Sequence, residues 1–297
     1  VRAGRPGGWR GAGGMAGMGD MSAMGEGGRV PKKRVWLRLG GNPLTARPAT
    51  GEETALLLAP GGKASELPVE PHGGPYNVTF PTPDLGCYNV YLIRRVVAGD
   101  GLDVAVAKTE VVRGEMGRGG GTDPALVAAA TDARVPVEIV RERKGQEGLF
   151  TRINYGDTVI FRVLRAGRPV QNARVTFTSG RGWSNNVQSD ADGRAAFTVI
   201  RDYYPDSWSL FDKRHRETWL VAASFATPEA GEYQGGKYAS TRYAATLSGA
   251  YYPGVADYES YASGLMIGLT GLLFTGTGVW LYRRRRMKPF REVRFDD

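Results

Sequence analysis

Four methionines near the N-terminus have the residue type and spacing that most strongly suggest chemistry. Met15, Met18, Met21 and Met24 recur at every third position in the segment GMAGMGDMSAMG. A thioether sulfur is a soft ligand that selects Cu(I), so a segment of this kind outside the cytoplasm could gather three sulfurs around one copper ion. We therefore predict a Cu(I) site at these methionines. The alternative is that they cluster by chance in a low-complexity leader.

The sequence lacks the residues that other catalytic or metal-binding sites require. A single cysteine, Cys87, excludes a disulfide within the chain, and two histidines, His72 and His215, exclude a His-rich metal cluster. Neither histidine accompanies a G-x-S-x-G nucleophile motif, and the glycine run at 117–121 lacks the GK[ST] of a phosphate-binding loop. We predict no catalytic residue and no enzymatic activity. Cys87 is interpreted as a small buried apolar residue.

The positive charge of the chain lies at its two ends. The formal net charge is +9. Residues 1–34 carry seven basic and two acidic side chains, and residues 283–297 carry seven and three, so the ends contribute +5 and +4 and the residues between them are neutral overall. A nucleic-acid-binding protein would usually place its basic residues on a folded face with aromatic residues interleaved. We therefore predict no nucleic-acid partner.

A stretch near the C-terminus has the length and composition of a membrane span. Ser260–Tyr282 contains 23 residues without a charge, which as a helix would span roughly 34 Å, slightly more than a hydrocarbon core of about 30 Å. Arg283–Arg286 follow at once, whereas Asp257 and Glu259 precede the stretch. Because basic residues favour the cytoplasmic side, we predict a single-pass protein of the cytoplasmic membrane. Its C-terminal tail would be cytoplasmic and the bulk of the chain periplasmic.

Small residues form a stripe along this span. Ser260, Gly264 and Gly268 recur at every fourth position, which places them on one face of a helix. Such stripes let two helices approach closely, so we predict packing against a helix of another membrane protein. The alternative is that glycine is simply more frequent in membrane helices. This topology requires export, and residues 1–34 contain no apolar run of signal-peptide length, so we expect a signal that was removed or that precedes Val1.

The rest of the chain has the pattern of short β-strands. Glycine makes up 43 of the 297 residues and proline 17, and brief β-type runs alternate with Gly, Pro and Asp turns. Within Cys87–Ile93, successive side chains are expected on opposite faces of a strand. We predict an all-β fold of two Ig-like antiparallel β-sandwich units in series, plus one C-terminal transmembrane helix. The predicted boundaries are a disordered segment 1–34, a first sandwich 35–114, a linker 115–134, a second sandwich 135–250, a juxtamembrane segment with the transmembrane helix 251–282, and a basic cytoplasmic tail 283–297.

Hairpin motifs dominate the second predicted unit. A strand ending in EIV is followed by GDTVIFRVLRAGRPVQNARV, then by DADGRAAF and later by WLVAASF. We expect Gly193 to supply the positive φ that closes the DADG turn, and we interpret Asp190 and Asp192 as part of that turn rather than as a calcium loop. These motifs resemble a family of exported bacterial proteins with an uncharacterised β-sandwich domain, similar also to carboxypeptidase-regulatory-like and invasin-like sandwiches, over about residues 135–226. The resemblance implies a sandwich. Because members are often found beside nickel or cobalt uptake systems, it also implies a role near such a transporter.

One long segment departs from that family pattern. RDYYPDSWSLFDKRHRE carries four aromatic residues among mixed charges, namely Tyr203, Tyr204, Trp208 and Phe211. Tyr and Trp offer a large contact area for little lost entropy, so we predict a partner-binding loop. The alternative is that these rings pack on their own sandwich or rest on lipid headgroups.

Together these features predict a non-enzymatic accessory subunit of an integral-membrane complex. The helix and the aromatic loop would contact the integral-membrane partner, and the complex would act in transition-metal (Ni/Co or Cu) uptake or handling. Two alternatives stay open. One is a structural subunit of a respiratory or photosynthetic membrane enzyme complex, and the other is a periplasmic Cu(I) chaperone that uses the methionine segment.

Overall fold

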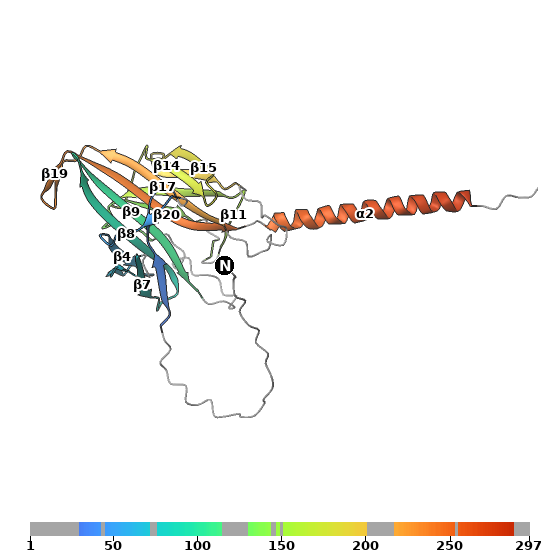
Figure 1. Cartoon of the computed structure of the whole chain (residues 1–297), viewed down its shortest axis with the longest axis horizontal. Coiled ribbons are helices and arrows are strands. Elements are labelled where there is room, and N and C mark those ends of the chain that lie inside the picture. The colour runs from blue at the N-terminus through green and yellow to red at the C-terminus, as the bar shows by residue number, and fades with distance from the viewer. Residues whose placement is uncertain are drawn as a thin grey trace, which may run out of the picture.

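The computed structural model consists mostly of β-strands, with one long helix at the C-terminal end (Figure 1). It describes residues 30–42, 45–71, 76–114, 130–143, 147–148, 151–200, 217–252 and 255–287. The predicted β-rich class with one C-terminal apolar helix is confirmed.

The largest sheet has nine strands and runs through both halves of the chain. Its order is β15-β14-β17-β20-β9-β8-β4-β5, and β11 pairs with β20 beside that path. Neighbouring strands are antiparallel, except that β20 runs parallel to β9 and to β11. The strands are β4 Thr54–Leu58, β5 Ala64–Leu67, β8 Gly86–Ala98, β9 Gly101–Arg113, β11 Ile153–Asn154, β14 Arg174–Ser179, β15 Ser184–Gln188, β17 Glu217–Thr227 and β20 Ser240–Tyr252.

The parallel pair β9–β20 joins the two predicted units. Ser240 pairs with Gly101, and the register continues to Ser248 and Thr109. Strand β9 belongs to the first predicted unit and β20 to the second, so one sheet takes strands from both. Two separate sandwiches in series are therefore not confirmed. The pairing satisfies backbone N–H and C=O groups of β9, which as a free edge would invite aggregation.

A smaller sheet packs on the second half of the large one. It contains β10 Glu138–Glu142, β12 Thr158–Arg165, β13 Arg168–Pro169 and β16 Arg194–Thr198. Aromatic rings connect the two layers: Phe161 of β12 lies edge-on to Trp219 of β17 with ring centroids 5.4 Å apart, and Phe197 of β16 lies 5.7 Å from Phe177 of β14. These rings form the centre of the main hydrophobic core.

Strand β8 is buried on both faces. Tyr91 and Ile93 join the main core, whereas Tyr88, Val90 and Leu92 join a second core on the opposite face. The alternation predicted for this strand is thereby confirmed. The second core is covered by a three-stranded sheet made of β1 Lys32–Trp36, β7 Tyr76–Pro81 and β6 Glu70–Pro71. Two further pairs complete the described strands, β2 Arg38–Leu39 with β3 Arg47–Pro48 and β18 Gly231–Tyr233 with β19 Gly236–Tyr238.

The turn before β16 has the predicted structure. Gly193 adopts a φ of 74°, and a Cβ at this position would lie 2.6 Å from the carbonyl oxygen of Val163. The Asp190 carboxylate oxygen Oδ1 accepts the backbone N–H groups of Asp192 at 2.9 Å and Arg194 at 2.8 Å. Asp190 therefore acts as the acceptor of an Asx-type turn, which only glycine can close without a clash.

Helix α2 spans Val255–Arg286 and projects away from the sheets (Figure 1). It extends beyond the uncharged stretch at both ends and includes the four arginines that we expected to begin the tail. Arginine is a good helix former, and cations in the last turn interact favourably with the helix dipole, so the helix continues through them. Residues Ala262–Arg286 are long and apolar enough to cross a membrane. The prediction of one C-terminal helix that is long and apolar enough to cross a membrane is therefore confirmed.

Candidate functional site

The structure describes only part of the residues that we predicted to bind a ligand or partner. The proposed copper ligands Met15, Met18, Met21 and Met24 lie outside the described residues, and so do the aromatic residues Tyr203, Tyr204, Trp208 and Phe211. The copper site and the partner-binding loop stay predictions. Of the predicted helix-packing stripe, Gly264 and Gly268 are described with their surroundings, and Ser260 is described as part of helix α2.

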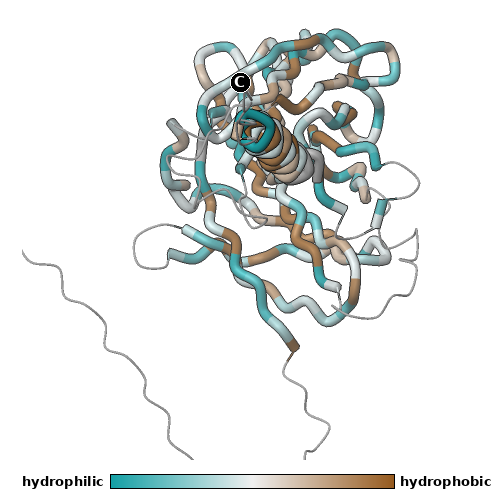
Figure 2. Tube along the Cα trace, turned by 90° about the vertical axis from the view of Figure 1, so that its right-hand side faces the viewer, coloured by the Kyte–Doolittle hydropathy of each residue, from teal (hydrophilic) through white to brown (hydrophobic). Residues whose placement is uncertain are grey.

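Most of the exposed large apolar side chains of the described residues lie on α2. None of the membrane-length segment Ala262–Arg286 is buried by the described residues, and Ile267 and Phe274 are 74% and 76% exposed. Figure 2 views this helix nearly end-on and shows apolar residues along it. Leaving one such side chain in water rather than burying it costs about 1.5–3 kcal/mol. A surface of this kind needs lipid or another protein to cover it.

Small residues continue along one face of α2. Gly264, Gly268 and Gly271 follow the helical spacing i, i+4, i+7. A Cβ at any of the three would meet no atom within 4 Å, so these glycines serve no packing within the described chain. Thr275 continues the face, and its hydroxyl donates to the Gly271 carbonyl oxygen at 2.8 Å. The polar group is thereby satisfied within the helix, and the face is open to close approach by a second helix. Sequence reasoning missed the extension to Gly271 and Thr275, although the same spacing rule could have found it.

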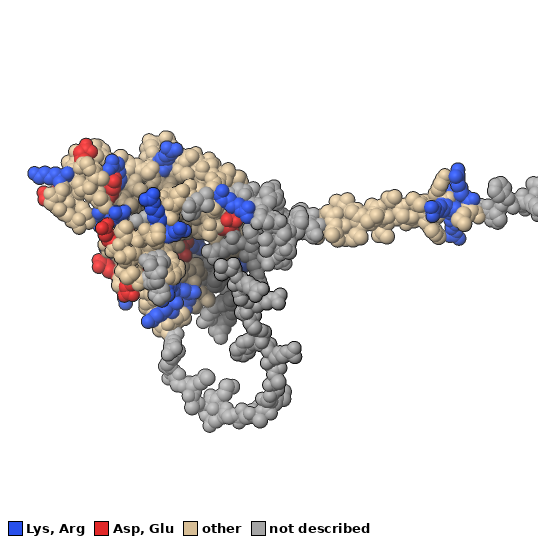
Figure 3. Space-filling view, in the orientation of Figure 1, with Lys and Arg blue, Asp and Glu red and all other residues tan. Residues whose placement is uncertain are grey.

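Cations and aromatic rings meet at the far end of α2. The Arg284 guanidinium lies 5.2 Å from the Trp280 ring centroid, and that of Arg286 lies 5.4 Å from the Tyr282 ring centroid. Figure 3 shows the basic side chains at this end as a cluster, next to a coloured stretch of the helix that carries no charged side chain. Aromatic rings and long basic side chains favour the headgroup level of a bilayer. This end of the helix therefore has the composition of a membrane interface.

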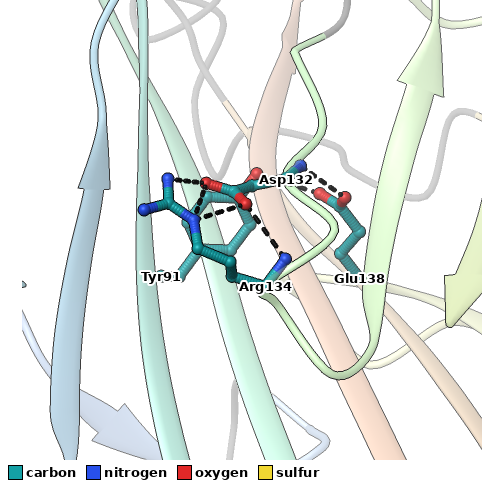
Figure 4. A network of polar contacts seen from close by, with 4 residues as sticks. All are labelled: Tyr91, Asp132, Arg134 and Glu138. Atoms are coloured by element: carbon teal, nitrogen blue, oxygen red, sulfur yellow. Dashed lines mark hydrogen bonds and ion pairs between the residues drawn. The ribbon is translucent and has the colours of Figure 1, made fainter. Parts of the chain in front are cut away.

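A buried ionic network lies in the main core, and sequence reasoning missed it. Lys108 of β9 and Glu138 of β10 form an ion pair with Nζ and Oε2 3.0 Å apart, and their side chains are 1% and 0% exposed. The Tyr91 hydroxyl of β8 donates to the same Oε2 at 2.9 Å, and the backbone N–H of Asp132 donates to Oε1 at 3.2 Å. Figure 4 shows Glu138 beside Asp132, whose carboxylate binds Arg134. A sequence signal existed, because Lys108 follows Leu102, Val104 and Val106 on the inward face of its strand.

This network ties the two predicted units together. Lys108 and Tyr91 come from the first unit and Glu138 from the second, and Asp132 comes from the segment predicted as the linker between them. Burial raises the pKa of the Tyr91 hydroxyl far above its ordinary range, and the neighbouring Glu138 carboxylate raises it further. Tyr91 therefore stays a neutral donor. Each oxygen of the Glu138 carboxylate has a partner, so the arrangement is a satisfied structural link.

Cys87 has the properties of a structural cysteine. Burial raises the pKa of its thiol to about 12, with the Glu110 carboxylate contributing and the Arg143 guanidinium opposing the rise. The thiol is therefore protonated at neutral pH and is a poor metal ligand. Among the described residues, no group of three or more His, Cys, Asp or Glu side chains could hold a metal ion. His72 and His215 lie outside the described residues.

Comparisons with known proteins give no family. No family model matches the chain, and no curated protein matches it. A solved structure titled "Biofilm associated protein - BSP domain" is 13% identical, covers 67% of this chain and 26% of its own, and superposes with a TM-score of 0.17. A second, of a Salmonella alpha-2-macroglobulin reacted with methylamine, is 13% identical, covers 75% of this chain and 14% of its own, and has a TM-score of 0.21. The chain thus spans a small part of either protein, and similarity this low carries no argument about fold or function.

Proposed function

We propose that the protein is a non-enzymatic, single-pass subunit of an integral-membrane complex, anchored by α2. Its β-rich body lies on the extracytoplasmic side and contacts the partner subunits. Basic residues favour the cytoplasmic side of a membrane, so Arg283–Arg286 support a cytoplasmic position for the C-terminal end of α2. The body then lies in the periplasm.

The observation that carries this proposal is the open glycine face on an apolar helix that the described body does not cover. Lipid alone would satisfy the apolar side chains. Lipid gives no reason for a face of small residues, whereas a second transmembrane helix does, since small residues let two backbones approach closely. A second transmembrane helix is therefore the partner that this surface fits best.

The proposed biological setting of the complex rests on the sequence. The resemblance of residues 135–226 to an exported family found beside nickel or cobalt uptake systems, and the methionine spacing, favour transition-metal uptake or handling. A structural subunit of a respiratory or photosynthetic complex would use the same helix face. A periplasmic Cu(I) chaperone would need only the methionine segment and no fixed partner.

The helix proposal is tested by co-purification of the full chain from its own membranes in mild detergent. The wild type is expected to elute with one or more integral-membrane subunits in fixed ratio. Gly264→Ile places a branched side chain on the open face and should reduce partner recovery roughly tenfold, the factor that about 1.4 kcal/mol gives. Gly276→Ile is the matched control, because Gly276 is equally unobstructed but lies about 120° away around the helix.

Two outcomes would contradict the subunit proposal. One is elution of the wild-type chain alone, and the other is partner recovery that Gly264→Ile leaves unchanged. Copper analysis of the same preparations separates the chaperone alternative. A chain that elutes alone and binds copper stoichiometrically, and loses the metal when Met15, Met18, Met21 and Met24 are all changed to Ala, is a chaperone.

A further inference from the structure

The interior of the body becomes charged at the end from which α2 leaves. Because β9 and β20 are parallel, the last residues of β9 lie at the same end of the sheet as the last residues of β20. Beyond the Lys108–Glu138 pair, Glu110 of β9 binds the Arg143 guanidinium at 2.6 Å, and Arg141 forms an ion pair with Glu147. The side chains of Arg141 and Arg143 are 10% and 9% exposed. Two guanidinium groups are thus largely withdrawn from water here.

These two arginines line a cavity of about 340 Å³. Arg152 and Tyr252 also line it, and the Arg152 guanidinium lies over the Tyr252 ring at 4.6 Å from the centroid. Tyr252 ends β20, and α2 begins three residues later, which is roughly 11 Å of chain at most. The cavity therefore lies at the membrane-facing end of the body.

Two buried hydrogen-bond donors in the lining have no partner. Arg141 Nε and Trp219 Nε1 are both buried without an acceptor, and both residues line this cavity. A buried donor left unsatisfied costs about 1–3 kcal/mol, and more when it belongs to a charged group. Neither nitrogen has surface that a water molecule can reach, so these two donors lie behind the cavity wall and would not themselves contact a bound anion.

The charge of the lining points to an anion. The lining carries three guanidinium groups, of Arg141, Arg143 and Arg152, and one carboxylate, of Glu110. Arg143 pairs with Glu110, and Arg141 pairs with Glu147 beside the cavity. Burial lowers the pKa of Arg141, and the neighbouring Arg143 lowers it further against the opposing effect of Glu147. An anion in the cavity would offset that desolvation. Guanidinium groups bind phosphate and carboxylate through paired N–H donors, and three of them suit the several oxygens of a phosphate.

We propose that this cavity binds a phosphate-type oxyanion, held by Arg141, Arg143 and Arg152. The phosphate belongs either to a lipid headgroup or to a soluble phosphate compound. The site is independent of the helix contacts on which the proposed subunit function rests, so either can fail without the other.

The test uses the full chain in mild detergent and two phosphate sources. Equilibrium dialysis measures binding of radiolabelled inorganic phosphate, against chloride at matched ionic strength. Native mass spectrometry measures retention of phosphatidylglycerol against phosphatidylcholine of the same chain length. Arg152→Gln removes the one lining arginine that forms no ion pair with the described residues, so the fold should persist, which circular dichroism checks. Arg242→Gln is the matched control, because Arg242 pairs with Asp103 on the exposed surface near the opposite end of β9 and β20.

We expect one equivalent of phosphate or phosphatidylglycerol on the wild type. Arg152→Gln should weaken its binding roughly tenfold to a hundredfold, the range for losing one charge-assisted hydrogen bond, and Arg242→Gln should leave it unchanged. Arg152-dependent retention of phosphatidylglycerol alone assigns the site to a headgroup, and Arg152-dependent binding of inorganic phosphate assigns it to a soluble compound. The proposal is overturned if neither source binds above its control, or if Arg242→Gln weakens binding as much as Arg152→Gln.

Discussion

At the scale of single residues, the buried Lys108–Glu138 pair should be the most sensitive point of the body. Lys108→Met leaves the Glu138 carboxylate buried without its cation, and breaking such a pair typically costs about 3–5 kcal/mol of unfolding free energy. The double variant Lys108→Met/Glu138→Leu removes both charges and should lose much less. Urea unfolding of the full chain in detergent, followed by tryptophan fluorescence, measures both. A free energy of unfolding within about 0.5 kcal/mol of the wild-type value is typical of a surface substitution. Such a result for Lys108→Met would contradict the burial of Lys108 described above.

The sequence indicates the burial of such charged residues only in part. Lys108 continues the inward series of Leu102, Val104 and Val106, so its strand marks it as buried. Glu138 lies between Val137 and Ile139, and strand alternation would place it on the face opposite to them. Their meeting depends on how β9 and β10 pack, which no local pattern states. By contrast, the Gly193 turn and the Asp190 acceptor are local, and the sequence was enough to predict them.

At the scale of elements, β20 is the strand on which the shared sheet depends, and its tightest point is Gly249. A Cβ at Gly249 would lie 2.2 Å from Cζ2 of the buried Trp219. Gly249→Val should therefore lower the free energy of unfolding by about 1–3 kcal/mol, the usual cost of overpacking. Ser248→Val, at the exposed neighbouring position, is the control and should change stability by less than about 0.5 kcal/mol. Equal losses in the two denaturant midpoints would mean that the indole does not lie against Gly249.

The sequence predicts single strands well and their long-range partners poorly. The alternation in Cys87–Ile93 and the apolar run of α2 come from the residues themselves, and both appear where we expected them. The parallel pair β9–β20 joins residues 139 positions apart, such as Asp103 and Arg242. Because both strands have apolar inward faces, either could equally have paired within its own half. Only the tertiary fold decides between two units and one continuous sheet.

At the scale of the whole molecule, the shared sheet predicts that the two halves of the body behave as one folding unit. A protease site inserted between Gly120 and Gly121 of the full chain would cut the connection between them. The fragments should still elute together and unfold in one transition, because the β9–β20 hydrogen bonds, the common core and the Lys108–Glu138 pair all cross the cut. A site inserted between Pro253 and Gly254 is the control. It should release α2 from the body in detergent, since the described residues bury none of the helix segment Ala262–Arg286. Separation of the two halves in native buffer would mean instead that they are independent units in series, and that the nine-stranded sheet does not hold them together.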